Sequence, residues 1–154
     1  MSDSHGDYSQ VLKIVKRNIG YCDMFIHLGD GERDIDKLRL VYPNEDIIHL
    51  RGNCDYGDES PSASVITAGG IRIFCTHGHR YSVGAGLDIL AANAEKNACR
   101  IALFGHTHVR TETALNGIFI MNPGSCSCPR DGKPPSFGVI EIQGNKFTSG
   151  IFDV

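Results

Sequence analysis

Four short apolar runs in this chain each end at side chains that can bind a metal ion, and this pattern constrains the fold more than any other feature. In chain order the runs are followed by Asp30, by Asn53, by His77, and by His106 with His108. A short apolar run bounded by Gly and polar residues is typical of a buried β-strand. In α/β folds the loops that follow the strands converge at one edge of the sheet, where ligands bind. The pattern therefore predicts a group of metal-binding side chains at one sheet edge.

The remaining segments complete the prediction of one α/β domain. Apolar stripes at helical spacing predict three helices, at residues 8–19, 32–41 and 86–98. The apolar runs at residues 24–28, 46–50 and 101–104 predict strands. Apolar segments on either side of Gly-containing turns predict three hairpins, at residues 65–75, 111–121 and 137–151. No repeat or linker divides the chain, so we expect a single domain with mixed sheets over residues 1–154.

Composition narrows the class of protein. Of the 154 residues, 41% are hydrophobic and 21% are charged, which fits a globular domain rather than a disordered chain. The net charge of -3 argues against a protein that coats nucleic acid. No apolar run is long enough to span a membrane, and the first residues do not resemble a signal peptide. We therefore expect a cytoplasmic protein with no membrane partner, whose six cysteines remain thiols.

The chain opens with Asp3 and His5, which add two ligand-type side chains. The full set offers four imidazoles, two carboxylates and one amide oxygen, from Asp3, His5, Asp30, Asn53, His77, His106 and His108. Asp30 can bridge two ions because a carboxylate has two oxygens. Two divalent ions about 3.5–4 Å apart clamp a phosphoryl group and lower the pKa of a shared water. We expect two divalent ions here, manganese first, with nickel, cobalt, iron and zinc as alternatives to it.

Six short motifs follow one another along the chain: Asp3-Ser4-His5-Gly6, Gly29-Asp30, Gly52-Asn53-Cys54-Asp55, Thr76-His77-Gly78-His79, Gly105-His106-Thr107-His108 and Asn122-Pro123-Gly124-Ser125. In this order they resemble the motifs of the metallophosphoesterase (calcineurin-like) superfamily, and the short chain resembles its small prokaryotic phosphodiesterase branch. The resemblance implies an α-β-β-α sandwich of two mixed sheets flanked by helices. It also implies a homo-oligomer, a dimer or larger.

The same resemblance implies a dinuclear metal centre. One ion would be held by Asp3, His5, Asp30 and His108, and the other by Asp30, Asn53, His77 and His106. The activity implied is that of a metal-dependent phosphodiesterase, in which a bridging hydroxide attacks the phosphorus of a small phosphodiester in line with the leaving oxygen. We take Asp30, Asn53 and His79 as catalytic residues, and Asn53, His79 and Arg130 as candidates for holding phosphate oxygens. An ordinary loop histidine is an equal alternative for His79.

The chain departs from the wider superfamily at Cys54, where a histidine usually protonates the leaving group. A thiol carries no positive charge at neutral pH and donates its proton readily only to fairly basic leaving groups. We therefore expect the enzyme to favour aryl esters and other acidic leaving groups.

Other features have plainer interpretations. His27 and His49 lie within strand-like runs, where core roles are favoured over metal binding, and Asp34 reads as an ordinary surface charge. The alternative function is that of a catalytically weak protein-binding scaffold of the same fold, resembling a retromer subunit. A scaffold can lose metal ligands freely, whereas every ligand position is filled here, which favours the enzyme.

The N-terminus is the remaining irregularity. Only Met1 and Ser2 precede Asp3, whereas every other ligand loop follows an apolar run. We therefore expect a truncated first strand, a native start several residues earlier, and an Asp3 that hangs from a mobile end. The ion held in part by Asp3 would then bind more weakly than the ion held by Asn53, His77 and His106.

Overall fold

The computed structural model describes all residues from 1 to 154 and contains three α-helices, one short 3₁₀ helix and nine strands. The helical elements are α1 (Tyr8–Asn18), α2 (Glu32–Val41), η1 (His79–Tyr81) and α3 (Asp88–Lys96). The strands are β1 (Phe25–His27), β2 (Ile47–His49), β3 (Ala63–Ala68), β4 (Ile71–Thr76), β5 (Ile101–Leu103), β6 (Arg110–Leu115), β7 (Ile118–Pro123), β8 (Ser136–Gln143) and β9 (Lys146–Asp153). The three predicted helices, the predicted strands and the three hairpins are all confirmed, and only η1 was not foreseen.

The sheets differ from the expected pair. There are three: a parallel pair β1-β2, a five-stranded mixed sheet in the order β3-β4-β5-β7-β6, and an antiparallel hairpin β8-β9. The expected α/β fold with a mixed sheet and three helices is confirmed, but the structure has three sheets where two were expected, because β1-β2 and β8-β9 share no ladder. Side chains connect these two regions instead: the Arg17 guanidinium of α1 donates to Asp153 O at 3.0 Å, and Phe137 of β8 belongs to the same apolar cluster as Val11 and Phe25.

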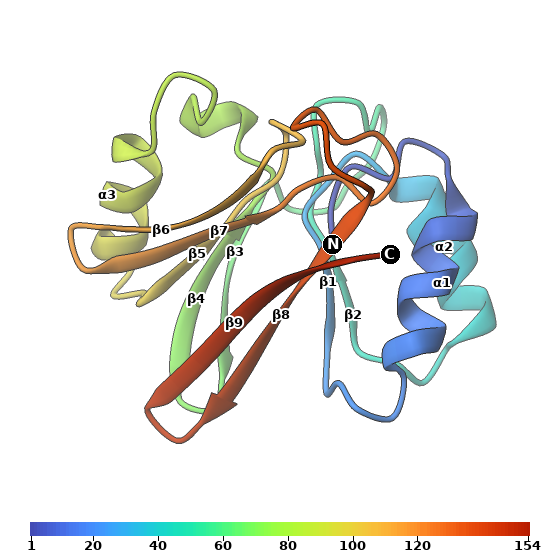
Figure 1. Ribbon diagram of the computed structural model, residues 1–154, viewed down its shortest axis with the longest axis horizontal. Coiled ribbons are helices and arrows are strands. Elements are labelled where there is room, and N and C mark those ends of the chain that lie inside the picture. The colour runs from blue at the N-terminus through green and yellow to red at the C-terminus, as the bar shows by residue number, and fades with distance from the viewer.

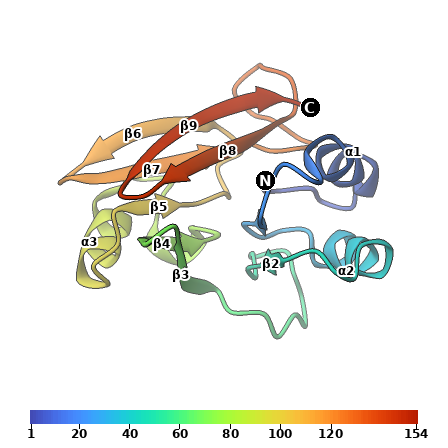
Figure 2. The same cartoon turned by 90° about the horizontal axis from the view of Figure 1, so that it is seen from below.

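Helices cover the outer faces (Figures 1 and 2). α1 and α2 lie beside β1 and β2, and α3 lies on the far side of the five-stranded sheet. One apolar cluster packs Val11, Ile35 and Phe25 together, and a second packs Leu90 of α3 against Phe74 of β4. A third cluster lies between the sheets. Each fully buried Val, Leu, Ile or Phe side chain contributes about 1.5–3 kcal/mol to the free energy of folding. No helix is long and apolar enough to cross a membrane.

The N-terminal residues are buried rather than frayed. Ser2 and Asp3 are fully buried, and Met1 is 9% exposed. The Leu28 N–H donates to Met1 O, and the Asp3 N–H donates to Gly29 O, both at 3.0 Å. The expectation that Asp3 hangs from a mobile end is therefore wrong, because these few residues already bond to the chain beside β1.

Candidate metal centre

The candidate ligands lie on loops that follow the strands. Asp30 comes after β1, Asn53 after β2, His77 after β4, and His106 and His108 after β5. Eight non-glycine residues have a positive φ, and five of them belong to the candidate set: Asp3, His5, Asp30, His106 and His108. Such conformations cost about 1–3 kcal/mol each and cluster at functional sites. The backbone strain thus coincides with the residues that the sequence identified.

The first group of ligand atoms comes from Asp3, His5 and His108. Asp3 Oδ1 lies 3.3 Å from His108 Nε2, and the Nε2 atoms of His5 and His108 are 3.1 Å apart. Asp3 Oδ1 is buried and has no hydrogen-bond partner. A buried carboxylate oxygen without a donor is costly unless a cation balances it. These three residues therefore fit a divalent ion.

Asp30 joins this group to a second one. Asp30 Oδ2 lies 3.4 Å from His77 Nε2 and 3.8 Å from His5 Nε2. His77 Nε2 is 3.1 Å from Asn53 Oδ1. Asp3, Asp30 and His77 also offer ligand atoms within 4.8 Å of one another. Asp30 is thus placed to contact ions on both sides.

Backbone carbonyls orient two of the imidazoles. His77 Nδ1 lies 2.8 Å from Leu28 O, and His108 Nδ1 lies 2.6 Å from Cys128 O. A ring nitrogen facing a carbonyl oxygen carries the proton, so the Nε2 atom of each ring keeps its lone pair. Those lone pairs point toward the carboxylates, as metal-binding histidines require.

His106 and His79 lie at the margin of the site. The ring of His106 is 5.2 Å from that of His77, and the ring of His79 is 5.4 Å from it. Neither residue belongs to a group of three ligand atoms within 4.8 Å. The structure thus brings Asp3, His5, Asp30, Asn53, His77 and His108 together directly, and leaves the other two imidazoles beside them.

Charge balances explain the shifted pKa values. Burial acts to raise the pKa of Asp30, but the adjacent His77 imidazole and the hydrogen bond from the Cys54 N–H outweigh it and hold the pKa below its usual range. Burial acts to lower the pKa of His77, but the contacts with Asp30 and Asp3 raise it. The adjacent Asp3 carboxylate raises the pKa of His108. Burial lowers the pKa of His79, and the nearby His77 adds to this. Asp30 therefore stays ionised and able to bind cations.

Two supporting carboxylates were not assigned a role from the sequence. Asp55 accepts the backbone N–H groups of Asp30, Gly31 and Gly52, each at 2.8 Å. Asp34 accepts the Ser4 hydroxyl at 2.6 Å. It is 1% exposed, so its interpretation as a surface charge is wrong. These contacts join loops that are distant in the sequence. The only sequence signal for such a supporting role was the position of Asp55, two residues after the candidate ligand Asn53.

A second cluster of acid and imidazole lies beneath the site. His49 Nε2 is 3.1 Å from Asp58 Oδ2 and 3.5 Å from Asp55 Oδ2. The ring centroids of His27 and His49 are 5.3 Å apart, with the rings tilted by 37°, and both residues are buried. The core location expected for these two histidines is confirmed. His49 supports the carboxylate that holds the loop of Asp30.

Cys54 and Arg130 border the site. The Cys54 N–H donates to Asp30 Oδ1 at 2.8 Å, while its thiol is exposed. Partial desolvation, followed by the contact with Asp30, raises the pKa of this thiol to about 11. Arg130 donates its backbone N–H to His108 O at 3.0 Å. This contact holds the loop beside the site through the backbone, and the Arg130 guanidinium takes no part in it.

The fold and this cluster define an α/β protein with carboxylates and imidazoles gathered at one sheet edge, a donor set suited to divalent metal ions. A family model described as the calcineurin-like phosphoesterase superfamily domain matches residues 1–145. The chain belongs to that superfamily, and within it to the small phosphodiesterase branch.

Three relatives illustrate the match. The probable metallophosphoesterase YsnB of Bacillus subtilis is 30% identical over 99% of this chain and 88% of its own length. Phosphodiesterase YfcE of Escherichia coli is 32% identical over 62% of this chain, which spans 52% of that protein. The crystal structure of a predicted phosphoesterase from Streptococcus pneumoniae superposes with a TM-score of 0.87, at 31% identity, over 99% of this chain and 86% of that one.

The fold is also shared with a sorting protein. Vps29 from Entamoeba histolytica, in complex with zinc, superposes with a TM-score of 0.71 at 21% identity, over 92% of this chain and 88% of that one. At that identity the likeness concerns the fold alone.

Proposed function

We propose that this chain is a divalent-metal-dependent phosphodiesterase with a dinuclear centre. The observation that carries the proposal is the position of Asp30, whose Oδ2 faces His77 on one side and His5 on the other. Asp3, with a buried and unpartnered Oδ1, supports an ion on the His5 side. Bound divalent ions in such a centre supply an activated water and neutralise charge on the phosphate.

Seven residues of the chain would bind the two ions, in two sets that share Asp30. Asp3, His5, Asp30 and His108 would hold one ion, and Asp30, Asn53, His77 and His106 the other. The placement of the first four supports their assignment, since their ligand atoms lie within about 4 Å of a neighbour in the group. The ring of His106 lies 5.2 Å from that of His77, at the margin of the second group. A mixed imidazole and carboxylate set favours manganese, with nickel, cobalt, iron and zinc as alternatives.

Asn53 and His79 would orient the substrate. Asn53 turns its Oδ1 to His77 and its amide nitrogen toward Cys54, at 3.2 Å from the sulfur. That amide lies at the open side of the site and can donate to a phosphate oxygen. His79 has a lowered pKa, so it is neutral at neutral pH and can still donate one N–H.

The leaving group determines which substrates react. Cys54 occupies the place next to Asn53, and its pKa of about 11 keeps it a neutral thiol. It offers neither positive charge nor an acidic proton to a departing alkoxide. Aryl diesters, whose leaving groups need no proton, should therefore react faster than alkyl esters.

A screen of metals against substrates tests the proposal. Metal-free protein is supplied with Mn, Ni, Co, Zn or Mg and assayed on bis(4-nitrophenyl) phosphate, 4-nitrophenyl phosphate and cyclic nucleotides. We expect the aryl diester with manganese to give the highest rate, and metal-free protein to give none. Protein that binds two ions yet turns over no ester with any metal would support the scaffold instead.

A further inference from the structure

Cys54 lies at the solvent side of the candidate metal centre. Its sulfur, one ring nitrogen of His5 and one carboxylate oxygen of Asp30 all lie within 4.8 Å of one another. Cys54 and His5 are exposed, whereas Asp30 is 4% exposed. None of the other five cysteines belongs to a group of this kind. This thiol is therefore the one that can reach an ion at the centre.

The spacing of the three atoms is close to that of donors that share one ion. Zinc bonds are about 2.0–2.2 Å long to nitrogen and oxygen and about 2.3 Å long to sulfur, so two donors on one zinc are at most about 4.5 Å apart. His5 Nε2 and Asp30 Oδ2 are 3.8 Å apart, inside that limit. The sulfur, within 4.8 Å of both residues' ligand atoms, lies at its edge.

Two hydrogen bonds hold Cys54 beside Asp30. The Cys54 N–H donates to Asp30 Oδ1 at 2.8 Å, while Asp30 Oδ2 faces His5. The Asn53 amide donates to the Cys54 sulfur at 3.2 Å. Hydrogen bonds of this kind orient ligand atoms and tune the metal that they bind. The sulfur is thus positioned by its neighbours next to two candidate ligands.

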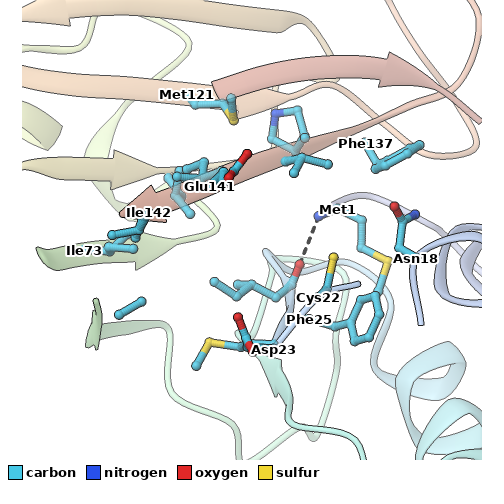
Figure 3. Close-up of a pocket in the computed structure, with 18 of the residues that line it drawn as sticks. Met1, Asn18, Cys22, Asp23, Phe25, Ile73, Met121, Phe137, Glu141 and Ile142 are labelled. Atoms are coloured by element: carbon cyan, nitrogen blue, oxygen red, sulfur yellow. Dashed lines mark hydrogen bonds between the residues drawn. The ribbon is translucent and has the colours of Figure 1, made fainter. Parts of the chain in front are cut away.

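The N-terminal segment holds His5 at the same place. The His5 N–H donates to Asp30 O at 3.0 Å, and the segment begins where the Met1 nitrogen donates to Ile26 O at 2.9 Å (Figure 3). Asp3 Oδ1 lies 4.0 Å from His5 Nε2, and this oxygen is buried without a hydrogen-bond partner. A buried negative charge that no donor balances favours a cation beside it. That cation would lie at the imidazole that the sulfur also approaches.

We propose that Cys54 is a metal-selective ligand, whose sulfur binds a thiophilic ion such as zinc or cadmium on the His5 side of the centre and does not bind manganese. This inference rests on the metal centre of the proposed function. Thiolate sulfur selects soft ions such as zinc, whereas carboxylate and water oxygens suit manganese. The thiol releases its proton to solvent as the sulfur binds the ion.

Such a ligand would make the centre respond differently to different metals. A catalytic zinc site keeps one position open for water or substrate. The sulfur would fill that position in the zinc-loaded protein and leave it open in the manganese-loaded protein. Added zinc should therefore inhibit the manganese-loaded enzyme, and Cys54 should strengthen that inhibition.

Cadmium absorption tests the proposal, because a cadmium–thiolate bond gives a charge-transfer band in the ultraviolet. Metal-free wild type, Cys54→Ser and Cys128→Ser are titrated with Cd²⁺, and their affinities for Zn²⁺ and Mn²⁺ are measured by calorimetry. Cys128 is the matched control, since its thiol is also exposed but belongs to no group of ligand atoms. We expect the band in the wild type and in Cys128→Ser, and no band in Cys54→Ser. Cys54→Ser should bind zinc at least tenfold more weakly, with its manganese affinity unchanged.

The outcomes separate this inference from the proposed function. Cadmium binding without a band, or a band that persists in Cys54→Ser, would overturn the role of Cys54 and leave the metal centre standing. A wild type that binds none of the three ions would overturn both. Equal inhibition of manganese-loaded wild type and Cys54→Ser by zinc would overturn the discrimination between metals. Protection of Cys54 from iodoacetamide by Cd²⁺, with Cys128 still labelled, is expected on the unmutated chain, and its absence would also count against the proposal.

Discussion

The Asp55 carboxylate accepts the backbone N–H of Asp30 at 2.8 Å, so that one buried acid holds the loop of another. It also accepts from Glu32 at 3.0 Å and from Gly52 at 2.8 Å, and it lies 3.5 Å from His49. The loops after β1 and β2 are thus fixed to one another through a single side chain. The positive φ of Asp30 is maintained by these bonds.

Replacing Asp55 with Asn should destabilise the protein strongly. An Asn amide keeps only one acceptor oxygen, so its NH2 group would face one of the two pairs of backbone donors that Asp55 now accepts and leave that pair unsatisfied. We expect a loss of about 2–4 kcal/mol in the free energy of unfolding at neutral pH. Urea denaturation measures it. Asp36→Asn is the matched control, because the Asp36 side chain is 64% exposed and its ion pair with Arg39 contributes little.

The stabilisation by Asp55 should depend on pH. Burial acts to raise the pKa of Asp55, but His49 and the backbone N–H groups outweigh it and hold the pKa below its usual range. The unfolded chain therefore binds the proton more readily, with a pKa of about 3.9. The contribution is complete above about pH 5 and is lost as the pH falls below about 4. The stability gap between the wild type and Asp55→Asn should narrow over that range, and a gap that widens on acidification would contradict the assignment.

Asp30→Asn should remove most metal binding and turnover. The substitution takes away the charge that faces both His77 and His5, while the side-chain shape is kept. We expect the protein to bind fewer than two ions, and the rate on an aryl diester to fall at least a hundredfold. Metal content by mass spectrometry and turnover are measured together, with Asp36→Asn again as control. An Asp30→Asn protein with two ions and the wild-type rate would exclude the dinuclear proposal.

Sequence patterns identified the strand-end ligands because position after a strand determines where a side chain lies in an α/β fold. Asp30, His77 and His108 were found in this way, and the structure brings them together. Asp34 was misjudged because its partner Ser4 is 30 residues away and comes near only when α2 folds beside the N-terminus. The burial of Asp3 was also missed, because its backbone N–H donates to Gly29 O, which is distant in the sequence and comes near only in the fold. Local periodicity carries no information on such distances.

Gly105→Ala should disturb the Asp3 side of the centre. A Cβ at Gly105 would meet the Ser2 hydroxyl and lie 2.9 Å from Asp3 Oδ2. Asp3 is fully buried, so it has little room to retreat. We expect at least tenfold weaker binding of one ion and about 1–3 kcal/mol lower stability. Calorimetric titration with manganese measures the affinities. Gly84→Ala, where nothing lies within 4 Å of the added carbon, should leave both quantities unchanged.

Cys54 should affect the choice of substrate without serving as a nucleophile. Its thiol is exposed beside Asn53, and its pKa of about 11 leaves almost no thiolate at neutral pH. Cys54→Ser should therefore keep most of the rate on bis(4-nitrophenyl) phosphate. Cys54→His should raise the rate on alkyl esters more than the rate on aryl esters, because an imidazolium can protonate a basic leaving group. The ratio of the two rates, measured for each variant at fixed manganese, separates this effect from a general change in activity. Trapping of a phosphorylated Cys54 during turnover would show instead that the thiol attacks phosphorus.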